Sequence, residues 1–131
     1  MKKCMCVFVC CLALWGCSQD YSGLPQLIVD FKWPEKRIHL SPEITLGNMP
    51  AGAVQIEVSM FDLDNRYPHG GGSIDYNGSN TIAVGALKNY EGPSPIYGAP
   101  RYEISVKALD SKGDVVAFGK KMKRFPPDEQ G

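Results

Sequence analysis

The stretch Val54-Gln55-Ile56-Glu57-Val58-Ser59-Met60 decides the fold class, because its apolar and polar residues alternate strictly. Successive side chains of a β-strand point to opposite faces of its sheet, so this alternation predicts a strand with one buried and one wet face. We expect all four apolar residues of the stretch, from Val54 to Met60, to face one core.

A second stretch, Tyr102 to Leu109, alternates in the same way and predicts a partner strand whose Ile104 and Val106 face that core. The segment Asp110-Ser111-Lys112-Gly113 has the composition of a hairpin turn. The chain then returns from Asp114 to Arg124, and the predicted strand there has Val116, Phe118 and Met122 in phase.

The rest of the chain carries weaker strand signals. Strand candidates lie at 27–31, 37–40 and 81–87, and turns are expected at 41–43 and 49–52. No stretch repeats apolar residues at helical spacing, and the chain contains 14 glycines and 10 prolines. The sequence therefore predicts one all-β domain over residues 26–127, an antiparallel β-sandwich with little helix.

The amino terminus has the form of an export signal. Met1-Lys2-Lys3 is followed by an apolar run from Cys4 to Trp15, too short to span a membrane. Leu14-Trp15-Gly16-Cys17 resembles a bacterial lipobox, although Trp15 departs from its pattern of small residues. Residues 1–16 are thus a predicted lipoprotein signal peptide, 17–25 a tether and 128–131 a tail; the alternative is an ordinary secreted protein cut nearby.

The cysteines agree with that interpretation. Four of the five lie within the signal, where they serve as apolar filler, so the mature chain keeps only Cys17 and no intramolecular disulfide is possible. A thioether to lipid explains this unpaired cysteine. We expect the lipid on Cys17 to anchor the protein in the cell envelope, at the outer membrane facing the periplasm, because Ser18 follows it.

Charge argues against a nucleic-acid partner. The full chain has 14 basic and 14 acidic residues, and removal of Lys2 and Lys3 leaves 12 − 14 = −2. A nucleic-acid-binding domain needs a clearly basic face. The basic run Lys120 to Arg124 could touch anionic lipid headgroups, but lysines that protect an edge strand explain it better.

Two segments rich in glycine and proline interrupt the strands, Phe61 to Gly72 and Tyr90 to Tyr102, and both are expected to be loops. One leaves the first clear strand and the other enters the second. If these strands are antiparallel neighbours, the two loops lie at one end of the sheet, where functional residues often gather. The tyrosines of these loops either line a pocket or cap the sandwich.

The order of short motifs along the chain carries a resemblance. Ser41-Pro42-Glu43, Asp62-Leu63-Asp64, Gly92-Pro93-Ser94-Pro95, Arg101-Tyr102 and Ala108-Leu109-Asp110 follow one another as in the phosphatidylethanolamine-binding protein family. The chain from Ser41 to Pro127 resembles the bacterial branch of that family. The resemblance implies a β-sandwich with a small anion pocket, which takes a phosphoryl group, at one end.

Carried over by position, the resemblance implies a set of ligand-binding residues: Asp62, Asp64, Gly92, Pro93, Pro95, Arg101 and Tyr102, with His69 supplying an imidazole from a different spacing. The chain also departs from the family. Pro100 stands where the family has a histidine, Ile96 replaces a proline, and no His-Trp pair is present. We therefore expect weak binding of a small anionic ligand, favoured when His69 is protonated.

Several of these residues have a structural alternative. Asp62 and Asp64 would project to the same side of an extended strand, where they could act as acid and base or bind a cation, or they could accept hydrogen bonds from loop N–H groups. His69 is either a ligand-binding imidazole or a solvated turn residue. His39 is expected at the surface of the 37–40 strand.

These observations are compatible with three functions. The favoured one is a membrane-anchored module that binds a small anionic or phosphoryl ligand, with no cofactor and no metal. The alternative is a cell-envelope interaction or structural lipoprotein with a degenerate pocket. An enzyme using Asp62, Asp64 and His69 ranks last, because no nucleophile with an adjacent base is visible.

Overall fold

A computed structural model describes residues 20–127 of the chain. Cys17, the predicted signal peptide and the 128–131 tail lie outside the described residues. Within 20–127 the chain forms strands and turns without a helix, which confirms the predicted all-β class. It follows that none of the described residues belongs to a helix long and apolar enough to span a membrane.

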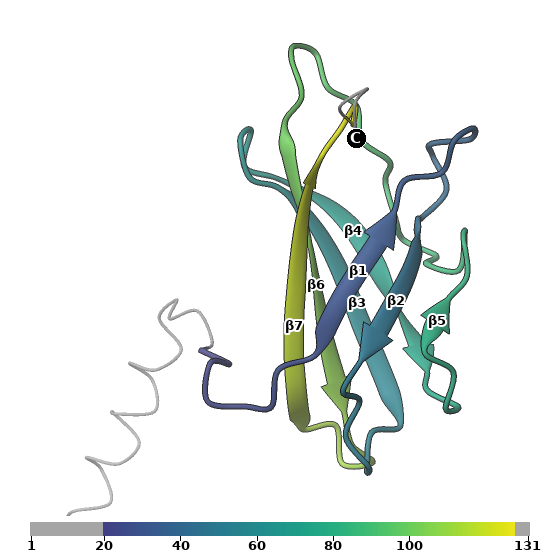
Figure 1. Ribbon diagram of the computed structural model, residues 1–131, viewed down its shortest axis with the longest axis vertical. Helices are drawn as coiled ribbons and strands as arrows, with labels where there is room; N and C mark the ends of the chain where they lie inside the picture. Colours follow the sequence, from purple (N-terminus) through teal and green to yellow (C-terminus); the bar gives the residue numbers. More distant parts are fainter. Residues whose placement is uncertain (1–19, 128–131) are drawn as a thin grey trace, which may run out of the picture.

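Two antiparallel sheets pack face to face (Figure 1). The larger one has the order β4-β3-β6-β7, and the smaller one has the order β1-β2-β5. The strands of the larger sheet are β4 (Tyr67–Asp75), β3 (Gln55–Asp62), β6 (Arg101–Leu109) and β7 (Val115–Arg124). Those of the smaller sheet are β1 (Ile28–Lys32), β2 (Glu43–Gly47) and β5 (Thr81–Ile82).

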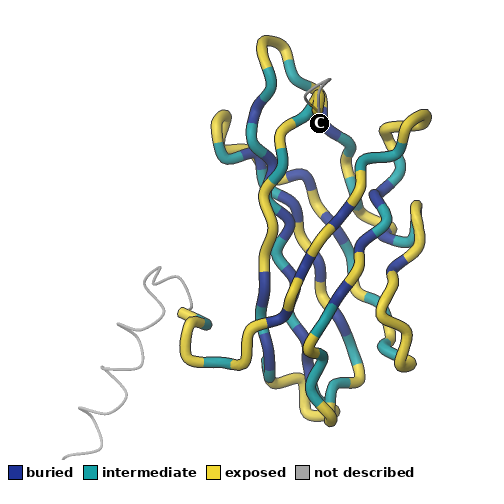
Figure 2. The backbone as a smooth tube through the Cα atoms, in the orientation of Figure 1, coloured by how far each residue is buried: buried dark blue, intermediate teal, exposed yellow. Residues whose placement is uncertain are grey.

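The core lies between the sheets and is centred on β3 and β6. The register of these strands sets Ile56 against Ala108, Val58 against Val106 and Met60 against Ile104, and all six are buried (Figure 2). Apolar residues of the smaller sheet cover them: Val29, Phe31, Ile44, Leu46 and Ile82. Val54 is the exception to the expected face, because it precedes β3 and is 45% exposed.

Two of the weaker strand predictions are wrong. Residues 37–40 form a turn in which the Leu40 N–H donates to the Arg37 carbonyl. The strand β2 begins instead at Glu43, inside the segment expected to turn, and Ile44 and Leu46 give it an inward face. Of the candidate at 81–87, only Thr81 and Ile82 pair with β2. His39 is exposed, as predicted, but it lies in the turn.

The largest error concerns β4, which occupies much of a segment predicted to be a loop. Glycine is poor in strands and has no side chain to mark a buried face, so the three glycines at 70–72 hid the strand. At Gly71 a Cβ atom would lie only 1.9 Å from the Val58 carbonyl oxygen, so the close approach of β3 requires glycine.

The predicted phase of β7 holds at Val116, which packs against the core, but is wrong beyond it. Ala117 and Gly119 face the core, whereas Met122 is 43% exposed. The register with β6 shifts between Ala108 and Leu109, as at a β-bulge, and such an extra residue reverses the alternation. Phe118 therefore lies on the outer face, where its ring packs 5.0 Å from that of Tyr21 in the predicted tether.

Candidate ligand-binding cavity at the loop end

A cavity of about 370 Å³ opens at the end of the larger sheet where β3 ends and β6 begins. Its walls come from the end of β3, the turn into β4, the start of β4 and the segment 91–100. The lining residues are Asp62, Asn65, Tyr67, His69, Ser94, Ile96 and Tyr97.

Backbone hydrogen bonds bring the two halves of this cavity together. Asp62 pairs with Tyr102 across β3 and β6, and the Leu63 N–H donates to the Arg101 carbonyl, so the two chain segments emerge side by side. On the other edge, the Glu91 N–H donates to the His69 carbonyl over 2.7 Å. The predicted juxtaposition of the two segments at one end of the sheet is therefore present.

The His-Gly-Gly-Gly stretch at 69–72 builds one wall of the cavity. Gly70 has a φ of +74°, and a Cβ atom there would lie 1.9 Å from the Asn89 carbonyl oxygen. Gly71 exchanges two backbone hydrogen bonds with Asn89. The glycines thus allow the segment after residue 88 to lie flat against β4, which carries Tyr90 and Glu91 up to His69.

His69 is only 3% exposed, so the interpretation as a solvated turn residue is wrong. Its Nδ1 lies 3.0 Å from the Glu91 carbonyl oxygen, which can only accept a hydrogen bond. Nδ1 therefore carries a proton, and in the neutral ring Nε2 is an acceptor. The rings of Tyr67 and Tyr102 each meet the imidazole edge-on at 5.2 Å and fix its plane.

The second nitrogen of this ring, Nε2, has no hydrogen-bond partner among the described residues. His69 is also one of the residues that line the cavity, so a ligand there would lie beside the imidazole.

Asp62 is 3% exposed and ends β3 at the cavity floor. One carboxylate oxygen accepts the N–H groups of Asp64 and Asn65 at 3.0 and 2.9 Å, and the other accepts the Asn65 side-chain amide at 2.8 Å. Burial raises the pKa of this carboxyl group, but the hydrogen bonds from Asn65 and Asp64 outweigh that effect and leave its pKa below the ordinary value. Asp62 is thus an anion at neutral pH.

Asp64 and Arg101 lie outside the cavity and bind each other. The Arg101 guanidinium donates to Asp64 over 3.0 and 2.8 Å, and the Arg101 N–H donates over 2.7 Å. Hydrogen bonds from Arg101 lower the pKa of Asp64, which in turn raises the pKa of Arg101. Asp62 and Asp64 were expected to project to one side if the strand extended through both, but β3 ends at Asp62 and the chain turns there.

The remaining predicted site residues, Gly92, Pro93, Pro95 and Tyr102, are not among the residues that line the cavity. Tyr102 is 1% exposed behind His69, Pro93 is buried and Pro95 is half-buried. Burial and the charge of Asp62 raise the pKa of Tyr102. Gly92 packs so closely on the 37–40 turn that a Cβ atom would lie 2.4 Å from the Ile38 carbonyl oxygen.

Tyr67 and Tyr97 line the cavity, whereas Tyr90 and Tyr102 are packed within the sandwich, so the tyrosines divide between the two predicted roles. Asn65, Ser94 and Ile96 were missed as lining residues. Asn65 directly follows the Asp-x-Asp sequence in a turn. Its place beside the predicted ligand-binding aspartates was the signal that could have identified it as a lining residue.

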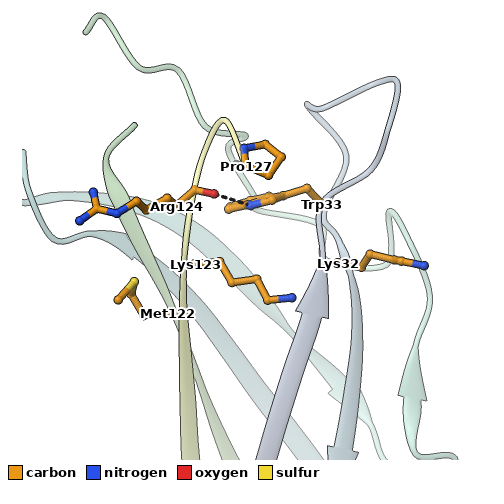
Figure 3. A pocket seen from close by; sticks show the side chains of 6 residues that line it. All are labelled: Lys32, Trp33, Met122, Lys123, Arg124 and Pro127. Carbon is orange, nitrogen blue, oxygen red and sulfur yellow. Dashed lines mark hydrogen bonds between the residues drawn. The ribbon is translucent and has the colours of Figure 1, made fainter. Parts of the chain in front are cut away.

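A second cavity, of about 440 Å³, lies where β1 and β7 diverge (Figure 3). Trp33 forms its centre and donates from Nε1 to the Arg124 carbonyl over 2.9 Å. The Lys32 and Arg124 side chains point in opposite directions, and Lys123 pairs with Asp30 at 3.2 Å. Because these cations do not converge, the cavity is a poor anion site. Among residues 20–127, no group of three His, Cys, Asp or Glu side chains is placed to hold a metal ion.

Comparison with solved structures supports the fold. The chain matches a crystal structure of a proposed phosphatidylethanolamine-binding protein homolog from Chlamydia trachomatis with a TM-score of 0.57 and 17% identity, over 82% of this chain and 100% of that one. No family model matches the sequence. No curated protein matches it either.

Proposed function

With the fold of a phosphatidylethanolamine-binding protein homolog as the premise, we propose that this chain is a membrane-anchored lipoprotein whose loop-end cavity reversibly binds a small polar ligand. The observation that carries the proposal is the cavity itself. It combines an ionised, almost fully buried Asp62 with an imidazole whose orientation is fixed and whose Nε2 has no hydrogen-bond partner among the described residues. Buried charge is costly to maintain, so its presence in a cavity favours a binding role.

The position of the first described residues fits an anchored module. The Tyr21 ring packs on Phe118 near the start of β7, whereas β3 ends and β6 begins towards the opposite end of the sandwich (Figure 1). The residues that line the cavity come from that opposite end. A lipid on Cys17 would therefore hold the domain with the cavity directed away from the attachment point. Such an arrangement leaves the cavity open to soluble ligands.

A phosphoryl ligand, which the family resemblance implies, has limited support from the lining. The Arg101 guanidinium is held outside by Asp64, and Asp62 repels anions. A phosphoryl group would rely on the protonated form of His69 and on loop N–H groups. We therefore expect weak affinity for inorganic phosphate, in the millimolar range or above, which corresponds to roughly 4 kcal/mol or less.

Calorimetric titration of the protein with phosphate and phosphorylethanolamine tests ligand binding. His69→Ala should weaken the binding of any ligand that enters the cavity. His39→Ala is the matched control, because His39 is exposed in the 37–40 turn. The proposal fails if both variants behave alike, or if neither these two ligands nor the amine probe described below gives a saturable signal.

The anchor has its own test. Cys17→Ser should release the protein from the membrane fraction or block its processing, with a mass that lacks the lipid. Ser18→Ala is the control and should leave membrane fractionation unchanged. Membrane association that survives Cys17→Ser would remove the lipoprotein part of the proposal without affecting ligand binding.

One observation favours the alternative of an interaction protein. Ile96 and Tyr97, on the 91–100 segment, are both 84% exposed, and exposed aromatic and branched side chains recur at protein–protein contacts. If the cavity takes no ligand, these two residues are the first place to look for a partner. Their exposure at the cavity rim is also compatible with contact to a bound ligand.

A further inference from the structure

The fixed charge lining the loop-end cavity is negative. Asp62 is held as an anion by three hydrogen bonds, and no lysine or arginine is among the lining residues. The nearest basic group identified by the resemblance, Arg101, is neutralised by Asp64 outside. A ligand group that enters this space therefore meets a negative potential, which favours a cation.

The nitrogen of His69 that makes no hydrogen bond among the described residues is an acceptor in the neutral ring. Because Nδ1–H donates to the Glu91 carbonyl, Nε2 keeps its lone pair, and His69 lines the cavity. Asp62 makes three hydrogen bonds out of about four that a carboxylate can accept, so it retains acceptor capacity. Both groups suit a donor with several N–H bonds and do not suit a second acceptor.

The cavity also presents aromatic rings. Tyr67 is 51% exposed and Tyr97 is 84% exposed, and both line the space in which His69 and Asp62 lie. The faces of aromatic rings attract cations that approach within about 6 Å. Two tyrosines beside a carboxylate are a favourable setting for an ammonium group.

From this arrangement we infer that the cavity binds a protonated primary amine, which enters with its ammonium group towards Asp62 and His69 Nε2 and passes the rings of Tyr67 and Tyr97. The inference rests on the proposed function and specifies its ligand class. It reverses the expectation from the family resemblance, in which an anionic group occupies the pocket.

Titration with three small probes separates the charge classes. Ethanolamine carries the ammonium group, ethylene glycol is a neutral molecule of similar size, and inorganic phosphate is the anion. We expect ethanolamine to bind at least tenfold more tightly than ethylene glycol and more tightly than phosphate. Saturable phosphate binding without ethanolamine binding would overturn the inference and leave the proposed function standing, whereas no binding by any probe would remove both.

Substitutions at Tyr67 test the aromatic wall without disturbing the buried carboxylate. Tyr67→Leu should weaken ethanolamine binding about threefold or more, and Tyr67→Phe should retain most of it because the ring remains. Asp62→Asn should abolish the preference for ethanolamine over ethylene glycol, with folding checked by thermal denaturation. If Asp62→Asn does not fold, the two Tyr67 variants provide the test. Equal losses of ethanolamine affinity in Tyr67→Leu and Tyr67→Phe would contradict the inference.

Discussion

The two halves of β3 are held in different ways. From Ile56 to Met60 the strand is fixed by apolar side chains that pair with β6 and pack under the smaller sheet. At Asp62 the same strand ends in a buried carboxylate fixed by hydrogen bonds. The first half is stabilised by burial, which tolerates small shifts, and the second by directional bonds, which set geometry. The cavity is thus a hydrogen-bonded structure attached to an apolar one.

Truncation in the apolar half should have the largest effect on stability. Ile104 is fully buried opposite Met60, so Ile104→Ala should lower the free energy of unfolding by about 2–5 kcal/mol. Glu57→Ala is the control on the outer face of β3 and should change it by less than about 0.5 kcal/mol. Urea denaturation of the three proteins measures both values, and similar losses would contradict the assigned faces of the sheet.

Gly70→Ala tests how the loop-end backbone is held. Its positive φ and the 1.9 Å approach of the Asn89 carbonyl should together cost more than about 2 kcal/mol. Gly113→Ala is a matched control, since Gly113 has a φ of +87° but no atom within 4 Å of the added Cβ. Gly113→Ala should cost only the positive-φ penalty, about 1 kcal/mol.

The contact between β4 and residues 89–91 also predicts which of these two glycine variants loses ligand binding. Gly70→Ala should separate the Glu91 carbonyl from His69 and so weaken ligand binding, whereas Gly113→Ala should leave binding unchanged. Equal destabilisation by the two substitutions would mean that the 89–91 segment moves aside easily.

The same contrast explains what could be foreseen from the sequence. Strands β3 and β6 alternate between apolar and polar residues, and each inward side chain has a partner, so periodicity located both. Strand β4 has glycines where a core face would show apolar residues, and its reason for being a strand lies in the backbone of Val58 and Asn89. Contacts between backbones distant in sequence leave no periodic signal.

The site was foreseen in part for a related reason. Asp62, His69 and the segment containing Ser94 were found because their order along the chain resembles a family. Arg101 is held outside the cavity because its guanidinium binds Asp64. No sequence motif encodes this contact. Turn geometry after Asp62 decides this contact, and with it the sign of the charge in the cavity.

Substitution of Asp62, which lines the cavity, should lower stability more than substitution of Asp64, which lies outside it. Asp62→Asn leaves an amide facing the Asn65 amide and the two N–H donors, so it should cost about 1–3 kcal/mol of stability. Asp64→Asn acts on an exposed pair and should cost much less. Thermal denaturation of both variants at neutral pH gives the comparison.

The dependence of stability on pH in acid should report the ionisation of Asp62. The pKa of Asp62 is lower in the folded state than its ordinary value of 3.8, so its contribution is complete above that value and is lost as the pH falls through the folded-state pKa. Stability profiles from pH 6 to pH 2 should therefore fall more steeply in the wild type than in Asp62→Asn, in the range below about pH 4. Parallel profiles would show that Asp62 is not held as an anion.

Removal of charges along the β7 edge should have the smallest effect on the free energy of unfolding. Lys120 lies 3.8 Å from Glu103, and its side chain is 59% exposed, so solvent screens the pair. Lys120→Ala should change the unfolding free energy by less than about 0.5 kcal/mol, and added salt should remove the difference. Lys123, on the same strand, contacts Asp30 and the Phe31 carbonyl of β1 and so joins the two sheets.

Lys123→Ala should accordingly cost more than Lys120→Ala, with part of the loss insensitive to salt, because the hydrogen bond between the sheets disappears along with the charge pair. If both lysines prove equally dispensable, the basic run of β7 acts only at the surface. Its role is then the protection of an edge strand from pairing with other chains, and increased aggregation of a Lys120→Ala/Lys121→Ala variant at unchanged stability would measure it.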